Sequence, residues 1–509
     1  MLHAFVEALR QDLTAFVFSA MSLVALVGLG EALRIRGHVT AERSRRVVHV
    51  GVGLFVAATP FLFSGPAFVY LLGVVFVGVN YVALQRGWFP GIHGTKRQSL
   101  GTVTFPLALL PALAVCWTAD PGRLFALQIA FLILAFSDPL ASLVGMHVAR
   151  SRESHRGKTP AGSVAFIISA FAISLGALVW LKTEGRIDWT TWEICAAAVT
   201  VAGATTATEA FGCRGWDNFF IIQAAIVVLV VFDEHPASRL TLVGAALSGV
   251  AFGVVALKLR FLTLSGSIAG GLLAASVIGL GGWAWVVPSF AFFISSSVLS
   301  QVGKRRKAGV EAITEKGSQR DAGQVYANGG IGWVLLLIYA LFPHDALYWG
   351  FLGAFAAATA DTWGTEIGTL SRRKPRLITT GRSVPKGTSG AVSIVGTAGA
   401  AGGAVIVWIS AWPFAIDLFA VTGVQAASLA VVVGGFLASL IDSVAGATVQ
   451  ARFRDQKTGQ ETERSGSGEG AFPLVRGWRW LQNDQVNWLC TLSGAILAMA
   501  CFLAVDFAS

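Results

Sequence analysis

Long apolar runs separated by short polar loops dominate this chain of 509 residues. About sixteen of these runs approach the ~20 residues that a helix needs to cross a bilayer. The run at 331–342 is shorter than the rest. This pattern predicts an all-α polytopic membrane protein with about sixteen transmembrane helices. Composition agrees, since 54% of the residues are hydrophobic, only 13% are charged and the mean hydropathy is +0.67.

Basic residues are distributed unevenly among the polar loops. Eight alternate loops hold 33 of the 38 Lys and Arg residues. The positive-inside rule predicts that these eight loops face the cytoplasm and that both termini lie outside. Membrane orientation therefore explains the net charge of +10, and no nucleic-acid partner is expected. We expect a plasma or inner membrane protein whose polar motifs, which lie in or beside these loops, face the cytoplasm.

Polar motifs repeat in the two halves of the chain. Asp138 and Asp361 each lie in an apolar run, with a hydroxyl residue four positions later and Gly seven positions later. On a helix, this spacing places the three residues on one face. A loop rich in Gly and hydroxyls follows each, GKTPAGS at 157–163 and KGTSGAVS at 386–393. We predict two parallel eight-helix repeats, divided into domains 1–235 and 236–509.

Carboxylates near the cytoplasmic ends of the runs are candidates for catalysis. A charged side chain within hydrocarbon is costly, so it is usually paired or functional, and for either Asp alone a purely structural role stays open. Carboxylates that bind Mg²⁺, beside cations and amides that hold phosphates, suit a nucleoside triphosphate. The sequence contains no Walker motif and no protein-kinase Gly-rich loop, so the expected site is of another type. The candidate carboxylates are Asp138, Glu209, Asp217, Asp361, Glu366, Asp442 and Asp484.

The first half of the chain resembles the phytol kinase/dolichol kinase family of CTP-dependent polyprenol kinases. Two departures are Arg46, where the family usually has Lys, and Ser137, where Gly commonly precedes the Asp. Neither departure removes a charge. The matching positions are Arg45-Arg46-x2-His49, Arg97-x-Ser99-x-Gly101-Thr102, Asp138-x2-Ala141-x3-Gly145, Gly157-Lys158-Thr159-x2-Gly162-Ser163, Glu209 and Asp217-Asn218.

The second half resembles the phytyl-phosphate kinase family. Its motifs are more numerous and more specific than those of the first half. They are Leu262-Thr263-x-Ser265-Gly266, Arg320-Asp321-x2-Gln324-x3-Asn328-Gly329, Asp361-Thr362-x3-Glu366-x-Gly368, Lys386-Gly387-Thr388-x-Gly390, Asp442-Ser443-x2-Gly446-Ala447-x2-Gln450 and Asn483-Asp484-x-Val486-Asn487.

Together the two resemblances imply a fused, bifunctional kinase. An isoprenoid alcohol of the phytol, geranylgeraniol or farnesol type would become the monophosphate and then the diphosphate, with CTP as donor and Mg²⁺ as cofactor. Both lipids would enter from the bilayer. Asp138, Asp217, Asp361 and Asp442 are the expected metal ligands. The expected nucleotide- and phosphate-binding residues are Arg46, His49, Arg97, Lys158, Thr159, Ser163, Asn218, Arg320, Gln324, Asn328, Lys386, Thr388, Asn483 and Asn487.

Two other functions stay open at this point. A CTP-dependent cytidylyltransferase would use a similar site, but it would release diphosphate and make a CDP-activated lipid. A secondary transporter also has repeats and intramembrane charge, although its site should lie at the bilayer midplane. The segment 454–470 is polar and rich in Gly and Ser, which predicts a mobile loop.

Overall fold

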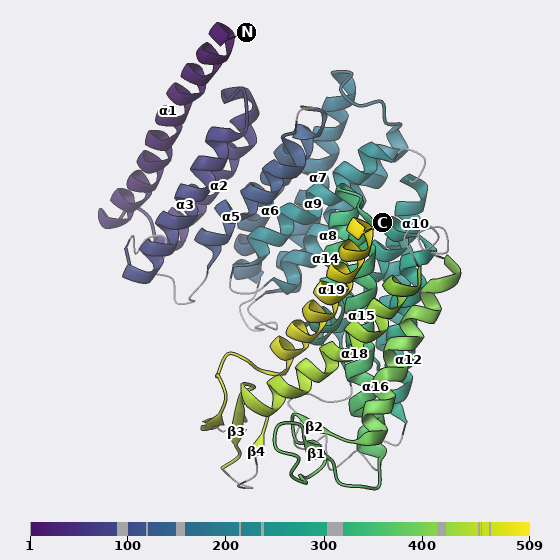
Figure 1. Cartoon of the computed structure of the whole chain (residues 1–509). Helices are drawn as coiled ribbons and strands as arrows, with labels where there is room; N and C mark the ends of the chain where they lie inside the picture. The colour runs from purple at the N-terminus through teal and green to yellow at the C-terminus, as the bar shows by residue number, and fades with distance from the viewer. Residues whose placement is uncertain are drawn as a thin grey trace. The chain divides into compact units, whose positions relative to one another are not determined.

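The computed structural model describes residues 2–88, 100–118, 121–148, 158–212, 215–235, 239–302, 319–414, 424–456, 459, 461–467 and 470–508. The chain divides into two compact units, unit 1 at Met1–Arg239 and unit 2 at Leu240–Ser509. Sixteen α-helices occur in the described part of the chain (Figure 1). Twelve helical segments are long and apolar enough to cross a membrane. The prediction of an all-α membrane protein is therefore confirmed, whereas the arrangement as two parallel repeats stays a prediction.

Unit 1 is organised around α6, which packs against α2, α5, α7 and α9. Two thirds of the spanning window of α6 is buried, the largest share among the candidate spans. Because α6 is apolar on nearly all sides, it suits this central position. The helices of unit 1 are α1 (Leu2–Ile35), α2 (Ala41–Leu62), α3 (Ala67–Arg86), α5 (Gly101–Cys116), α6 (Leu124–Val148), α7 (Pro160–Thr183), α8 (Thr191–Phe211) and α9 (Asp217–Glu234).

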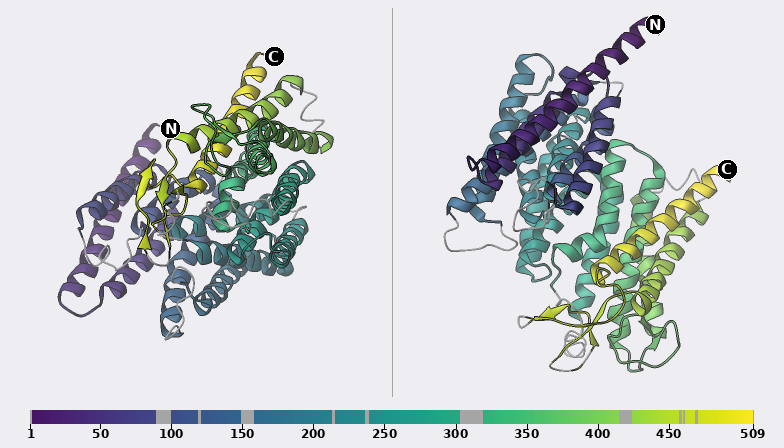
Figure 2. Two further views of the ribbon diagram at one scale, coloured as in Figure 1. Left: turned by 90° about the horizontal axis from the view of Figure 1, so that it is seen from below. Right: turned by 90° about the vertical axis from the view of Figure 1, so that its left-hand side faces the viewer.

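The described residues of unit 2 form eight further α-helices and several very short strands. Figure 2 shows the strands gathered at one end of this unit. The helices are α10 (Arg239–Lys258), α11 (Leu264–Ser276), α12 (Trp283–Gln301), α14 (Ala322–Leu341), α15 (Asp345–Leu370), α16 (Ile394–Ala411), α18 (Val424–Thr448) and α19 (Asn483–Ala508). The strands are β1 (Arg376–Leu377), β2 (Ala391–Val392), β3 (Arg452–Arg454), β4 (Glu461–Thr462), β5 (Gly466–Ser467), β6 (Gly470–Ala471) and β7 (Leu474–Arg476).

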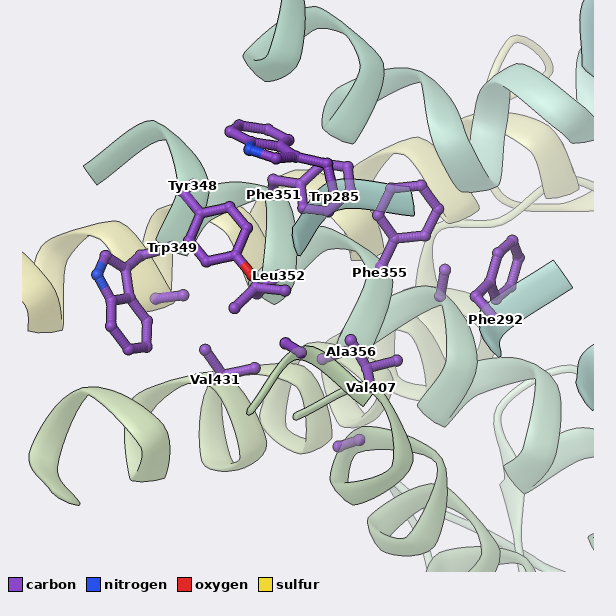
Figure 3. Close-up of a cluster of buried hydrophobic side chains, with 14 of the residues drawn as sticks. Trp285, Phe292, Tyr348, Trp349, Phe351, Leu352, Phe355, Ala356, Val407 and Val431 are labelled. Carbon is purple, nitrogen blue, oxygen red and sulfur yellow. The ribbon is translucent and has the colours of Figure 1, made fainter. Parts of the chain in front are cut away.

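The central element of unit 2 is α15, which contacts α12, α14, α16, α18 and α19. Its residues from Ala346 to Ala360 are buried, apart from one at the first turn. An aromatic cluster fixes its first half (Figure 3): the ring of Phe351 lies 4.5 Å from that of Trp285 and 4.8 Å from that of Phe355. This core holds the second half of α15, with Asp361 and Glu366, at one end of the unit.

Small residues let the neighbours of α15 approach it closely. A methyl group added at Gly353 would lie 2.6 Å from the Ala498 side chain of α19, and one at Gly396 of α16 would lie 2.8 Å from the Gly364 carbonyl oxygen. Contacts this short are not tolerated, so these positions need Gly. Glycines in the apolar runs therefore serve close helix packing, as is common in membrane proteins.

Two sequence expectations are corrected by the fold. The short run at 331–342 belongs to a full-length helix, because a capping box of Asp321 and Gln324 starts α14 at Ala322. The segment 454–470 was predicted to be a mobile loop, but its described residues contain parts of small antiparallel sheets, with β3 paired to β4 and β7, and β5 paired to β6. Ladder hydrogen bonds and the buried side chain of Phe453 order this region despite its polar composition.

Four helices fall outside the twelve candidate spans, although all had been expected to cross the membrane. They are α5, α8, α9 and α15. At 16 residues α5 is short, and the other three carry acidic residues in or beside the apolar run. Four of the seven predicted carboxylates, Glu209, Asp217, Asp361 and Glu366, lie on these three helices, so part of the candidate site coincides with weak membrane signals.

Membrane orientation is testable by cysteine labelling in a variant that lacks the native cysteines. Ser383 is exposed in a basic loop that we predict to be cytoplasmic, whereas the exposed Thr183, at the end of α7, is predicted to lie outside. Ser383→Cys should react with an impermeant maleimide only after permeabilisation, and Thr183→Cys should react in intact cells. Labelling with the opposite pattern would overturn the predicted orientation.

Candidate functional site

In unit 1 a Lys and two acids meet where several helices end. The Lys158 Nζ donates to Glu209 Oε1 at 2.6 Å and to Asp217 Oδ2 at 2.9 Å. Local sequence sets this position, because the Thr159 hydroxyl accepts a hydrogen bond from the Gly162 amide and so begins α7 just after Lys158. Residues 51 and 59 positions apart from Lys158 are thus joined in one cluster.

Electrostatics hold this cluster together. Burial works to lower the pKa of the Lys158 ammonium, but the carboxylates of Asp217, Glu209 and Asp138 outweigh it and raise that pKa. Lys158 is therefore charged at every physiological pH. The other oxygen of Glu209, Oε2, is buried and has no hydrogen-bond partner among the described residues. A buried oxygen of this kind can accept a ligand proton or bind a cation.

His49 and Asp138 face each other between α2 and α6. The His49 Nε2 lies 3.9 Å from Asp138 Oδ2 and 3.0 Å from the Leu134 carbonyl oxygen. One turn earlier in α2, Arg46 donates to Glu42 at 2.7 Å and to Ser142 at 3.3 Å. Ser142 is the hydroxyl residue four positions after Asp138, so the predicted helix face does meet polar partners.

An apolar cavity of about 120 Å³ lies beside these polar groups in unit 1. His49 and Asn218 line it, and Asn218 is anchored because its side-chain amide donates to the Gly101 carbonyl oxygen at 2.9 Å. Most of the remaining wall comes from apolar side chains of α1, α2, α3 and α5. The cavity can thus accept an apolar chain whose polar end lies near His49.

Unit 2 contains a larger and more polar cavity of about 360 Å³. The second half of α15, the start of α14, α16 and α19, and the end of α18 surround it, together with the loop before α16. It brings together residues more than 160 positions apart in sequence. The predicted site residues that line it are Arg320, Gln324, Asn328, Asp361, Glu366, Lys386, Thr388, Asp442, Asn483 and Asn487. Asp484 is the sequence neighbour of Asn483 and begins α19 with it.

Two carboxyl groups meet at this cavity. The side chains of Asp361 on α15 and Asp442 on α18 lie close enough to interact with each other. The Oδ2 atom of Asp442 is buried and has no hydrogen-bond partner among the described residues. Two adjacent carboxylates repel each other when both are ionised, whereas a bound cation would let both carry their charge. The pair is therefore suited to bind a divalent cation.

Backbone contacts fix Arg320 at the edge of this cavity. Its amide donates to the Phe261 carbonyl oxygen at 3.1 Å, and its carbonyl oxygen accepts from the Thr263 amide at 3.0 Å. Any side chain at Gly266 would collide with that carbonyl group, which explains the Gly in the motif at 262–266. The motif therefore begins α11 and positions Arg320, and we assign it no direct contact with a ligand.

The loop before α16 is held in place by contacts with α15 and with α18. The Lys386 ammonium donates to the carbonyl oxygens of Thr369 and Ser371, at the end of α15. Gly390 has φ +76° and lies so close to α18 that a methyl group there would sit 2.5 Å from the Ala447 side chain. Thr388 donates to the Pro385 carbonyl oxygen at 2.8 Å. Lys386 and Thr388 thus shape this loop while they line the cavity.

Sequence reasoning missed a second acid–base network in this wall. Glu463 Oε1 accepts from Arg452 at 2.9 Å, from Ser389 at 2.5 Å and from Gln450 at 3.4 Å. Glu463 also lines the cavity. The β3–β4 pairing brings Arg452 and Glu463 together. Because the sequence predicted a mobile loop here, it did not predict this pairing or the network. The alternation of polar residues with buried Phe453, directly after the 442–450 motif, is the signal that could have predicted a strand.

A metal site was predicted in each unit. Among the residues that the structure describes, no group of three or more His, Cys, Asp or Glu side chains is close enough to hold a metal ion. Mg²⁺ needs fewer protein ligands, because it commonly binds through one or two carboxylates plus phosphate oxygens and water. The Asp361–Asp442 pair fits that requirement.

Two predicted phosphate-binding residues remain to be placed. Arg97 lies outside the described residues, and Ser163 lies in the first turn of α7.

Comparison with known proteins identifies the family. The family described as Integral membrane protein DUF92 matches residues 247–495, which lie within unit 2. Protein PGR of Arabidopsis thaliana is 33% identical over 212 residues, which cover 38% of this chain and 73% of that protein. An uncharacterized membrane protein of Methanocaldococcus jannaschii is 30% identical over 242 residues, covering 48% of this chain and 86% of its own length. The chain belongs to the DUF92 family of integral membrane proteins.

This DUF92 protein is also related to a kinase. The phytol kinase of Synechocystis is 29% identical over 206 residues, which cover 40% of this chain and 84% of that enzyme. No solved structure matches the chain. The cavity in unit 2 lies within the DUF92 match, so most residues of the candidate site belong to the part of the chain that defines the family.

Proposed function

We propose that this DUF92 protein is a bifunctional isoprenoid kinase that uses CTP and Mg²⁺. Unit 1 would convert an isoprenoid alcohol to its monophosphate, and unit 2 would convert the monophosphate to the diphosphate. The observation that supports this most is the polar cavity of unit 2, which gathers paired carboxylates, cations and amides at the ends of apolar helices. The relationship to a phytol kinase favours an isoprenoid substrate.

In unit 2 the proposed chemistry needs charge neutralisation and alignment. Asp361 and Asp442 would hold Mg²⁺, and the ion would offset the triphosphate charge. An oxygen of the lipid phosphate attacks the γ-phosphorus of CTP, the bond to the β-phosphate oxygen breaks, and CDP leaves. The attacking phosphate oxygen is already ionised, so no base has to remove a proton. Such a transfer depends mainly on positioning and on electrostatic stabilisation.

In unit 1 the acceptor is a neutral hydroxyl, so a proton must also leave. Asp138, which faces His49 at 3.9 Å, is placed to accept it next to the end of the apolar cavity. Lys158 would bind nucleotide phosphate while Glu209 and Asp217 hold it in position. Mg²⁺ would be held by Asp217 in this assignment, which leaves Asp138 free to accept the proton. The apolar cavity would take the start of the isoprenoid chain.

Product analysis tests this proposal against its main alternative. Purified protein is incubated with geranylgeraniol or phytol, Mg²⁺ and CTP, and the lipid and nucleotide products are separated. We expect lipid monophosphate and diphosphate, with one CDP released for each phosphate transferred. Pyrophosphate together with a CDP-lipid would instead indicate a cytidylyltransferase. If no lipid is phosphorylated with CTP, UTP or ATP, the kinase proposal is wrong.

A further inference from the structure

A second, apolar cavity in unit 2 adjoins the polar one. Its volume is about 50 Å³, and its walls include Phe252, Leu273, Phe290 and Phe292. Arg320, Gln324 and Asn328 line this cavity and the polar cavity alike. We call the apolar cavity the Phe chamber. The shared residues form a boundary with a hydrocarbon-like space on one side and a charged space on the other.

Arg320 is the only cation on that boundary. Its guanidinium lies 5.7 Å from the centre of the Phe292 ring, inside the range of a cation–π contact. Among the described residues no acid forms an ion pair with it, and Glu366 is the single acid whose charge acts on its pKa, against the lowering effect of burial. A partly buried Arg without an ion-pair partner favours an anionic ligand, and phosphate matches its planar fork of donors.

The two amides on the boundary are already held in place. The Gln324 side-chain oxygen accepts from the Asp321 amide at 3.2 Å, and the Asn328 side-chain amide donates to the Gln324 carbonyl oxygen at 2.9 Å. Both residues lie on the first turns of α14, so this edge of the chamber is built on a rigid element. The Gln324 NH₂ group and the Asn328 oxygen stay available to a ligand oxygen or hydroxyl.

Volume limits what the Phe chamber can hold. A cavity needs about 10–15 Å³ on this measure for each water molecule, so the chamber has room for roughly four. That space is close to one branched five-carbon unit. A nucleobase would be larger, and it would leave its polar edge unpaired against Phe side chains, which is costly.

We propose that the Phe chamber binds the first isoprene unit of a lipid monophosphate whose phosphate is held by Arg320. The ligand is an anionic amphiphile, and the boundary between the two cavities fixes the point at which its charge meets its chain. The phosphate then faces the polar cavity, where the nucleotide would bind, and the rest of the chain extends away from the chamber. This inference deepens the function proposed for unit 2 and rests on it for the identity of the lipid.

Equilibrium binding without nucleotide tests the chamber independently of turnover. The probe is geranylgeranyl monophosphate, with inorganic phosphate as the ligand that lacks a chain. Ala274 is buried and lines the chamber, so Ala274→Leu fills it, and Ala251→Leu makes the same change on an exposed position of α10. We expect Ala274→Leu to weaken binding of the lipid phosphate at least ~10-fold and to leave inorganic phosphate unaffected. Ala251→Leu should bind both as the wild type does.

Charge at the boundary is tested by Arg320→Gln. This change should weaken both phosphate ligands by at least ~10-fold and raise the KM for lipid phosphate while the KM for CTP stays unchanged. Arg320→Lys keeps the charge but loses the planar fork of donors. Its affinity for both phosphate ligands should therefore lie between those of the wild type and Arg320→Gln. An unchanged affinity of Ala274→Leu for the lipid, or a rise in the KM for CTP in either variant, would overturn the proposal. Lipid phosphate that binds as expected but is never phosphorylated would support the chamber and reject the kinase function.

Discussion

Lys158→Met should abolish phosphorylation of the alcohol and leave phosphorylation of the monophosphate intact. Lys158 is bonded to Glu209 and Asp217, whose side chains are only 4% and 15% exposed. Without the ammonium, two acids face each other in a poorly solvated place, and breaking a buried pair in this way costs roughly 3–5 kcal/mol. The loss of the proposed phosphate ligand adds to this effect. Product formation from each substrate and the thermal unfolding midpoint measure the two consequences separately.

Matched variants separate stability from chemistry at Lys158. Lys182→Met places the same substitution at an exposed position near the end of α7, the helix that follows Lys158, and it should change neither product nor stability. Lys158→Met combined with Glu209→Gln removes one of the two facing acids. It should recover much of the stability but none of the alcohol kinase activity. Full recovery of activity in the double variant would show that Lys158 only neutralises Glu209.

Asp361→Asn should reduce conversion of the monophosphate to the diphosphate by at least ~10², the size of other electrostatic contributions to a transition state. The substitution preserves size and can keep a polar contact with Asp442, but it removes a negative charge that would hold Mg²⁺ beside the triphosphate. Asp345→Asn on the exposed first turn of the same helix is the control and should behave as wild type. The measurement is the initial rate with geranylgeranyl monophosphate and saturating CTP. A near-normal rate would make Asp361 a structural carboxylate.

The helices could be predicted because their signal is local. About sixteen apolar runs of the right length predicted about sixteen helices, and the described part of the chain contains sixteen α-helices. The boundary of α14 was missed because its first turns are polar. A capping box begins the helix there, and backbone hydrogen bonds of Arg320 with Phe261 and Thr263 fix the residue before the box. Neither feature is visible as hydrophobicity.

The residues of the candidate sites could be predicted to different extents, because some carry a local signal in the sequence and others are recognised only by their contacts. Intramembrane acids stand out in a sequence because burying them is costly, so Asp361 and Asp442 were found before their side chains were known to meet. Glu463 and Arg452 are charged residues in a polar segment, where charge is ordinary, and only the β3–β4 pairing reveals that they are buried. The Phe chamber could not be predicted, because a void depends on how side chains from α10, α11, α12 and α14 pack.

The central claim is that the two units carry out successive phosphorylations at separate sites. In its most direct test, Asp138→Asn protein and Asp361→Asn protein are each incubated with CTP and Mg²⁺. Each variant receives either the alcohol or the monophosphate as its lipid substrate. Asp361→Asn should convert the alcohol to monophosphate and stop there, whereas Asp138→Asn should leave the alcohol untouched and still turn supplied monophosphate into diphosphate. If each variant instead loses both steps while remaining folded, the two units form one composite site and the account of two kinases is contradicted.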